Sequence, residues 1–351
     1  MNNEYERKLH EQKQQYVNAA TVHDLPAIFH YWSNKHLRPR LRLVTGADSA
    51  VEFYGNAFLR SASKSSYTAQ FASLGAGDAT IEVAVAQYLR QKGLDDFRLV
   101  CHEVAPVLVA RANERIAASA LQDHVAVERC DLNTWIPAAN SLDGVMASHS
   151  LHHMVALESI FDAVARGLKD GGVFVTNDVI GRNGHLRWPE VKAWIDNLWP
   201  MLPNRLKHNH ALARFEENFS DWDCSVEGFE GIRAQDILPL LVSRFSFAAL
   251  LPYGGLVDVF VDRGFGHNFS LERPEDLALL DFLEFANEEL IDSGRIKPTM
   301  IFAEMGKKQP GLTPALYRGW SPDFCIRPVN ASAPTLNPAL FTGSAGPASA
   351  S

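Results

Sequence analysis

Two glycines and one carboxylate carry the clearest chemical signal in this chain. Gly75 and Gly77 follow the apolar run 71–74, and Glu103 ends a second apolar run about 28 residues after Gly75. Because glycine lacks a side chain, a Gly-x-Gly turn between a strand and a helix lets bare backbone approach a nucleotide-like ligand. A carboxylate at the end of the next strand would lie beside that turn and could accept hydrogen bonds from both hydroxyls of a ribose.

The elements that must position these residues follow from alternating apolar runs and helical patterns. Strands are predicted at residues 70–74, 98–102, 125–130, 144–148, 173–177, 245–251 and 299–305. Helices are predicted between them at residues 79–91, 105–120, 157–168 and 274–291. Short connections in this alternation are typical of an α/β fold with a doubly wound, mostly parallel sheet, which gathers the carboxyl ends of its strands at one edge.

Composition and pattern divide the chain into five segments. They are a helical leader or lid (1–66), a Rossmann-like cofactor-binding core (67–180), an inserted helical cap over the substrate region (181–243), the closing strands and helix of the core (244–308), and a tail whose end is predicted to be disordered (309–351). The cap segment contains Trp188, Trp194, Trp199 and Trp222. These tryptophans favour a pocket with apolar or aromatic walls, whereas an elaborated crossover or an oligomer contact is the alternative.

Four pieces of sequence resemble the class I S-adenosylmethionine-dependent methyltransferases. They are the loop 73–79, Glu103, the run Cys130-Asp131-Leu132 and the run 148–153, whose order and spacing are more specific than any one piece. The resemblance extends over residues 71–178 and resumes in the closing strands up to Lys308. It implies a Rossmann-like sheet of the seven-stranded methyltransferase type, with S-adenosyl-L-methionine as the cofactor.

The resemblance also implies roles for single residues. Gly75 and Gly77 would admit the methionine portion, and Glu103 would hold the ribose. Asp131 would accept a hydrogen bond from the exocyclic amine of adenine. The complete set of cofactor-binding residues predicted in this way is Ser73, Gly75, Gly77, Asp78, Glu103, Asp131, Leu132, Ser148 and His149.

Two positions depart from the family pattern. Ser73 stands where these proteins usually have an acid, and Ala79 stands where they have a third glycine. The carboxylate of Asp78, inside the loop, is a plausible substitute for the missing acid. Ala79 is the milder change, because a small residue still permits close packing of helix on strand.

Three residues are candidates for the reaction itself. Transfer of a methyl group from a sulfonium is an in-line displacement that needs alignment, and it needs a base only if the acceptor carries a proton. His153, His152 and Asp178 follow the fourth and fifth predicted strands, with His153 as the first choice of base. No metal is predicted, because adjacent histidines on a helix point apart and no third ligand follows at a characteristic spacing.

The predicted activity is methyl transfer to an oxygen or nitrogen of a small molecule, with carbon also open. The net charge of -8 argues against a nucleic acid partner, and no apolar run reaches membrane-spanning length. Four cysteines without paired spacing, and a polar N-terminus, predict a cytoplasmic protein. The leader and the cap offer surfaces for a homodimer.

Two alternative functions stay open at this point. An NAD(P)-dependent oxidoreductase would share the loop and the ribose acid, but its fuller glycine fingerprint would need a glycine where this chain has Thr80. A protein that binds S-adenosylmethionine without methylating is the second alternative, and the missing acid at Ser73 favours it.

Overall fold

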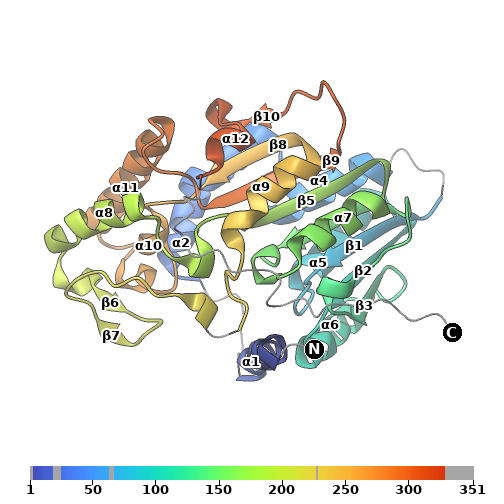
Figure 1. Ribbon diagram of the computed structural model, residues 1–351, viewed down its shortest axis with the longest axis horizontal. Coiled ribbons are helices and arrows are strands. Elements are labelled where there is room, and N and C mark those ends of the chain that lie inside the picture. The colour runs from blue at the N-terminus through green and yellow to red at the C-terminus, as the bar shows by residue number, and fades with distance from the viewer. Residues whose placement is uncertain (1–2, 19–24, 63–66, 227, 329–351) are drawn as a thin grey trace.

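An eight-stranded sheet runs through the centre of the protein (Figure 1), whose computed structural model describes residues 3–18, 25–62, 67–226 and 228–328. The strand order is β10-β8-β9-β5-β4-β1-β2-β3. The strands span Ala69–Leu74 (β1), Phe97–Glu103 (β2), Val125–Arg129 (β3), Leu142–Ser148 (β4), Leu168–Val179 (β5), Phe245–Tyr253 (β8), Met300–Lys307 (β9) and Ala315–Leu316 (β10). The disorder predicted near the C-terminus lies outside the described residues.

All strands of this sheet run parallel except β9, which pairs antiparallel with both β5 and β8. The doubly wound, mostly parallel sheet expected from the sequence is therefore confirmed. It has one strand more than the expected seven, because the two-residue strand β10 pairs in parallel with β8 at the edge. A strand this short cannot be predicted from the sequence pattern, since two residues carry no periodicity.

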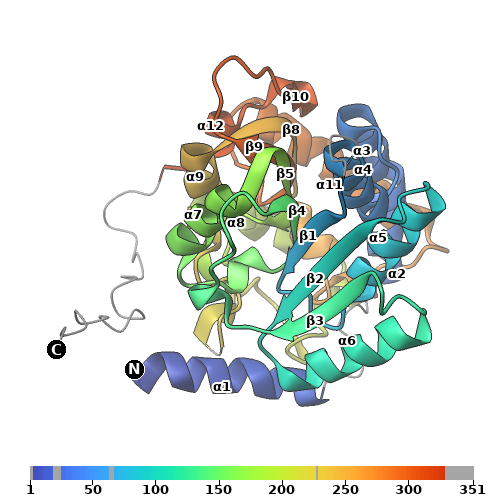
Figure 2. The same ribbon diagram turned by 90° about the vertical axis from the view of Figure 1, so that its right-hand side faces the viewer.

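Helices cover both faces of the sheet (Figure 2). The first face carries α3 (Arg38–Thr45), α4 (Ala50–Ala62), α5 (Thr80–Gln91) and α6 (Pro106–Ala118), and the opposite face carries α7 (Leu157–Gly167) and α9 (Ala234–Arg244). Because both faces are covered, the central strands β1 and β4 are buried along most of their length. In β1, for example, every residue except Gln70 is buried.

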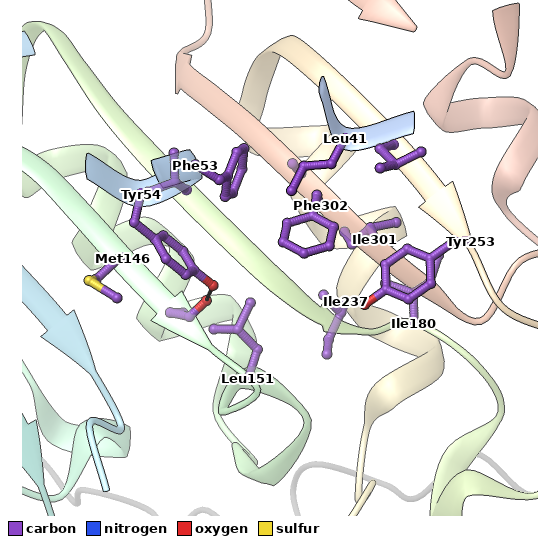
Figure 3. Close-up of a cluster of buried hydrophobic side chains, with 14 of the residues drawn as sticks. Leu41, Phe53, Tyr54, Met146, Leu151, Ile180, Ile237, Tyr253, Ile301 and Phe302 are labelled. Carbon is purple, nitrogen blue, oxygen red and sulfur yellow. Dashed lines mark hydrogen bonds between the residues drawn. The ribbon is translucent and has the colours of Figure 1, made fainter. Parts of the chain in front are cut away.

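Aromatic side chains join α4 to the antiparallel part of the sheet (Figure 3). The rings of Phe53 and Phe302 meet edge to face with centroids 5.2 Å apart. The fully buried Tyr54 donates a hydrogen bond from its hydroxyl to the carbonyl of Ala147, on β4. These contacts fix α4 against the strands whose ends form the site described below.

A cap lies beside the sheet and is built from two separate stretches of chain. The first stretch holds α8 (Pro189–Leu198) and the hairpin of β6 (His208–Asn209) and β7 (Arg214–Phe215), and the second holds α10 (Asp258–Val261). The backbone amide of His210 donates to the carbonyl of Gly264 over 2.7 Å, which ties the two stretches together. The predicted division into five segments stays a prediction, but α9, assigned to the cap, packs on β8 of the core.

The remaining helices frame the molecule. They are α1 (Asn3–Asn18), α2 (Ala27–Trp32), α11 (Pro274–Asp292) and α12 (Pro322–Cys325). Helix α1 lies alongside α6, across the edge at which β2 and β3 end (Figure 2). The helical leader predicted from the sequence therefore includes a helix that covers the carboxyl edge of the sheet.

Candidate active site

The carboxyl ends of the parallel strands bring the predicted cofactor residues to one edge of the sheet. Gly75 directly follows β1, Glu103 is the last residue of β2, and Ser148 is the last residue of β4. Asp131 comes two residues after β3. The parallel register, in which Glu103 pairs with Arg129, aligns these ends side by side.

The two glycines of the loop serve different purposes. Both have a left-handed backbone, with φ of +72° at Gly75 and +56° at Gly77. A Cβ atom on Gly75 would come within 2.7 Å of the Cβ of Ser150, so this glycine makes room for the loop after β4. A Cβ on Gly77 would meet no atom within 4 Å. Gly77 is therefore the glycine that faces open space, where a ligand can approach the backbone.

Glu103 is held against this loop by backbone hydrogen bonds. The Gly77 amide donates to its Oε2 over 2.9 Å, and the Ala105 amide donates to its Oε1 over 2.8 Å. Burial raises the pKa of the Glu103 carboxyl, while these amides oppose the shift. The carboxylate consequently lies next to the open space at Gly77.

Ser73 has an acidic partner that the sequence analysis missed. Its hydroxyl donates to Oε1 of Glu82, on α5, over 2.7 Å. Glu82 is almost completely buried, and burial raises its pKa to about 7. The only signal in the sequence is a glutamate nine residues after the serine that replaces the expected acid.

Asp78, the substitute considered from the sequence, is bound elsewhere. Its Oδ1 accepts hydrogen bonds from the amide and hydroxyl of Thr80, at the start of α5, and its Oδ2 accepts from Arg115 of α6 over 2.6 Å. These bonds cap α5 and join it to α6. Its predicted role in binding the cofactor stays a prediction.

Ala79 pays a conformational cost at the position of the third glycine. It is fully buried and adopts φ of +58°, in the left-handed region. An L-residue in this region costs roughly 1–2 kcal/mol relative to glycine. The small side chain fits the packing, as expected, but its backbone is strained.

Asp131 is bound by a residue from α1. Its Oδ1 accepts from the Asn133 amide over 3.0 Å, and its Oδ2 accepts from the Tyr5 hydroxyl over 2.7 Å. Burial, followed by the Asp131 carboxylate, raises the pKa of Tyr5, so the phenol is a stable donor. Leu132 is buried beside Asp131. The carboxylate oxygen predicted to serve adenine thus already has a donor.

His149 is oriented by a buried chain of hydrogen bonds behind β4 and β5. The Tyr253 hydroxyl donates to Oδ1 of Asn177 over 2.7 Å, which leaves the Asn177 amide nitrogen to donate to Nε2 of His149 over 2.9 Å. His149 is exposed and has φ of +50°, and Ser148 is half-buried. Both residues lie at the same edge as the glycine loop.

Asp178 and His152 form a buried pair. Asp178 is completely buried, and its Oδ2 accepts from the backbone amides of Ser150 and Leu151. Nδ1 of His152 lies 2.6 Å from the other carboxylate oxygen and donates to it. Although burial opposes protonation, Asp178 and the nearby Glu230 raise the pKa of His152 to about 10.

His153 is held by α1 instead. The Phe229 amide donates to Oε1 of Gln12, so the Gln12 amide nitrogen donates to Nδ1 of His153 over 3.1 Å. Burial and the neighbouring His152 lower the pKa of His153 to about 4, which keeps its ring neutral. The nitrogen that could accept a proton is therefore occupied by Gln12.

The two adjacent histidines do not point apart, contrary to the expectation from helical geometry. They lie in a short 3-10 turn, and their ring centroids are 4.2 Å apart. His185 and Glu230 join them from the cap side, with Nε2 of His185 2.7 Å from Oε1 of Glu230. Sequence reasoning missed both residues because 32 and 77 positions, respectively, separate them from His153.

Comparisons with known proteins find one matching family model and a group of similar solved structures. Residues 74–176 match the family model described as "Methyltransferase domain". No curated protein matches the chain. Among solved structures, geranyl diphosphate C-methyltransferase from Streptomyces coelicolor A3(2) is 13% identical with a TM-score of 0.46, and the match covers 86% of this chain and 98% of that one. The [4+2]-cyclase SpnF is 13% identical with a TM-score of 0.43, over 87% and 95% of the two chains.

The matched segment runs from the end of β1 to β5 and so contains the glycine loop, Glu103 and Asp131. Among the described residues, no helix is both long and apolar enough to cross a membrane. The match identifies a methyltransferase domain over these residues, and the domain lies in a doubly wound sheet. This agrees with the class I S-adenosylmethionine-dependent methyltransferase family, the enzyme class and the cofactor predicted from the sequence.

Proposed function

We propose that this methyltransferase acts on a small molecule and transfers the methyl group to an oxygen or nitrogen atom, with carbon as the third choice. The observation that carries the proposal is the Glu103 carboxylate held beside the open space at Gly77. A ribose placed there could donate from both of its hydroxyls to one carboxylate. The homodimer and the cytoplasmic location expected for the protein remain predictions.

The cofactor would lie along the ends of β1, β2 and β3. Its methionine portion would pass over Gly77, its ribose would bind Glu103, and its adenine would reach Asp131. Leu132, whose side chain is buried, would supply apolar surface to the adenine. This order follows the strand order of the sheet, so one extended ligand can contact all of these residues.

The cap supports a small acceptor, although its tryptophans do not. Trp188 and Trp199 are buried in the hydrophobic core, whereas Trp194 and Trp222 are about half exposed. The aromatic pocket walls expected from these four residues are therefore not supported. What favours a small acceptor is the position of His185 and Glu230, because Glu230 contacts His152 in the loop after β4 and His185 contacts Glu230.

Alignment, and not a free base, dominates the proposed chemistry. The acceptor nitrogen of His153 is bound to Gln12, and His152 is bound to Asp178. We assign His152, His153 and Asp178 to positioning of the loop after β4. Loss of positive charge at the sulfonium in the transition state is favoured when water is excluded, and in this proposal the cap and α1 would together exclude it.

Helix α1 would act as a lid over both halves of the site. Its Tyr5 binds Asp131 at the cofactor edge, and its Gln12 binds His153 beside the cap. Its Lys8 donates to the carbonyls of Ser225 and Gly228 in the cap. One rigid helix thus contacts cofactor and acceptor sides at once, so entry of the cofactor would require it to move.

Calorimetric titration with S-adenosylmethionine, S-adenosylhomocysteine and NADH tests the proposal. We expect micromolar or tighter binding of both sulfur compounds and no binding of NADH. Tight binding of NADH alone would instead support an oxidoreductase. Binding of S-adenosylmethionine without methyl transfer to any member of a panel of hydroxylated and amino compounds would support a non-methylating protein.

A further inference from the structure

Three donor groups from distant parts of the chain converge beside the loop after β4. They are His152 in that loop, His185 in the turn after β5, and Glu230 shortly before α9. Nε2 of His185 lies 2.7 Å, and Nε2 of His152 3.4 Å, from the same Oε1 of Glu230. One ligand atom from each residue lies within 4.8 Å of the other two.

The backbone around the cluster is shaped to bring these side chains together. The Gly184 amide donates to the Gly231 carbonyl over 2.8 Å, so the two loops that carry His185 and Glu230 are in direct contact. A Cβ on Gly231 would come within 3.0 Å of the His185 amide nitrogen. His185 itself adopts φ of +55°. A strained residue held by a close backbone contact is typical of a functional site.

The ring of His152 is oriented by the buried carboxylate of Asp178. Because Nδ1 donates to the buried Asp178, Nε2 is the nitrogen directed at Glu230. Asp178 is held in turn by the amides of Ser150 and Leu151. Histidines that bind metal ions almost always have a partner of this kind, since it fixes the tautomer and raises the basicity of the other nitrogen.

We propose that His152, His185 and Glu230 bind a divalent transition-metal cation of the Zn²⁺ type and leave at least one coordination position open. A site made of two imidazoles and one carboxylate binds such cations in preference to Mg²⁺ or Ca²⁺. Metal-ligand bonds of about 2.0–2.2 Å place the donor atoms roughly 3–3.5 Å apart. The donor atoms of His152, His185 and Glu230 already lie within 4.8 Å of one another, so a small closing movement would bring them to that spacing. His153 is excluded from the set because its Nδ1 accepts from Gln12.

An oxygen of the methyl acceptor could fill the open position. This role rests on the proposed function, whereas the cation site does not. The ligands come from the loop after β4 and from the cap, and none of them belongs to the predicted cofactor residues. Binding of the cation and binding of S-adenosylmethionine can therefore be measured separately on the same protein.

The test is a calorimetric titration with Zn²⁺ of the full-length protein, from which bound metal has first been removed with a chelator. A parallel titration with Co²⁺ serves as a spectroscopic probe of the site. We expect one Zn²⁺ per chain with a dissociation constant below about 1 µM. His185→Ala should weaken binding about 100-fold without lowering the unfolding temperature by more than a few degrees. The matched control is His210→Ala, in the group of His208, His210 and His267, whose neighbouring rings lie 4.9 and 5.3 Å apart.

Several results would overturn the proposal. Absence of Zn²⁺ binding, or binding that His210→Ala abolishes and His185→Ala leaves intact, would each exclude the site. If His185→Ala fails to fold, Glu230→Gln carries the same test, because glutamine keeps the size of the side chain but removes the charge. Zn²⁺ binding that survives when S-adenosylmethionine fails to bind would refute the proposed function and leave the cation site standing.

Discussion

The cofactor edge and the cap side of this protein are built by different means. At the cofactor edge, Gly77, Glu103 and Asp131 each lie at or just after the end of a strand, and parallel pairing alone brings them together. On the cap side, His152 meets His185 and Glu230 only because two loops fold back onto the core. The first arrangement depends on the sheet, and the second on long-range packing.

This difference predicts that single changes on the two sides fail in different ways. In the proposed site, a residue of the cofactor edge contacts the ligand, so its loss should weaken binding with little effect on stability. On the cap side, the buried Asp178 behind His152 holds the loop after β4 in place, so its loss should lower stability and leave cofactor affinity nearly intact.

The largest effect is expected for Asp178→Asn. The buried carboxylate accepts from His152 and from three backbone amides, and an asparagine must turn an N–H toward one of these donors. We expect a loss of about 4 kcal/mol in the free energy of unfolding, measured in urea, with the affinity for S-adenosylmethionine changed less than threefold. Asp170→Asn, on a fully exposed side chain, is the control and should cost under about 0.5 kcal/mol. A large drop in affinity would place Asp178 at the cofactor.

Glu103→Ala should produce the opposite result. If the carboxylate accepts both ribose hydroxyls, as we propose, its removal forfeits two charge-assisted hydrogen bonds, and affinity for S-adenosylmethionine should fall several hundredfold in calorimetry. Glu128→Ala, on an exposed side chain of β3, should leave affinity unchanged. Equal affinities for the two variants would refute the ribose assignment.

The parts of the molecule that were predictable from sequence are those governed by local rules. Every predicted strand and helix of the core is found, because apolar periodicity and glycine stops act over a few residues. The partners of these elements were not predictable. Glu82 is reached only through the packing of α5 on β1, and Tyr5 only through the placement of α1 across the sheet edge.

Glu82 gives a prediction for the pH dependence of stability. Burial raises its pKa from 4.5 to about 7 in the folded state, so the folded protein keeps a proton that the unfolded chain releases. Stability from this group is therefore lost as pH rises from about 4.5 to 7, by about 3 kcal/mol in total. Glu82→Gln should gain about this much relative to the original protein between pH 4 and pH 8, measured by urea unfolding at each pH. A difference that does not vary with pH would show that Glu82 is ionised when folded.

The smallest effect of the series, in free energy, is expected for Tyr5, whose side chain contacts Asp131 at the cofactor edge and Phe229 near the cap. Tyr5→Phe removes the hydroxyl that donates to Asp131 and keeps the ring, which packs on Phe229. If the hydroxyl competes with adenine, affinity for S-adenosylmethionine should rise about fivefold, the equivalent of one hydrogen bond. A fall in affinity in the same titration would instead make Tyr5 part of the cofactor site.

The most direct test of the account compares two glycines. Gly77 and Gly93 both have a left-handed backbone, and a Cβ on either one would meet no atom within 4 Å. Gly93 lies in the turn between α5 and β2, at the opposite edge of the sheet. Calorimetric titration of Gly77→Ala and Gly93→Ala with S-adenosylmethionine should show similar losses of stability, about 1 kcal/mol, but an affinity at least tenfold weaker for Gly77→Ala alone. Equal affinities for the two variants would contradict the claim that the cofactor passes over Gly77 beside Glu103.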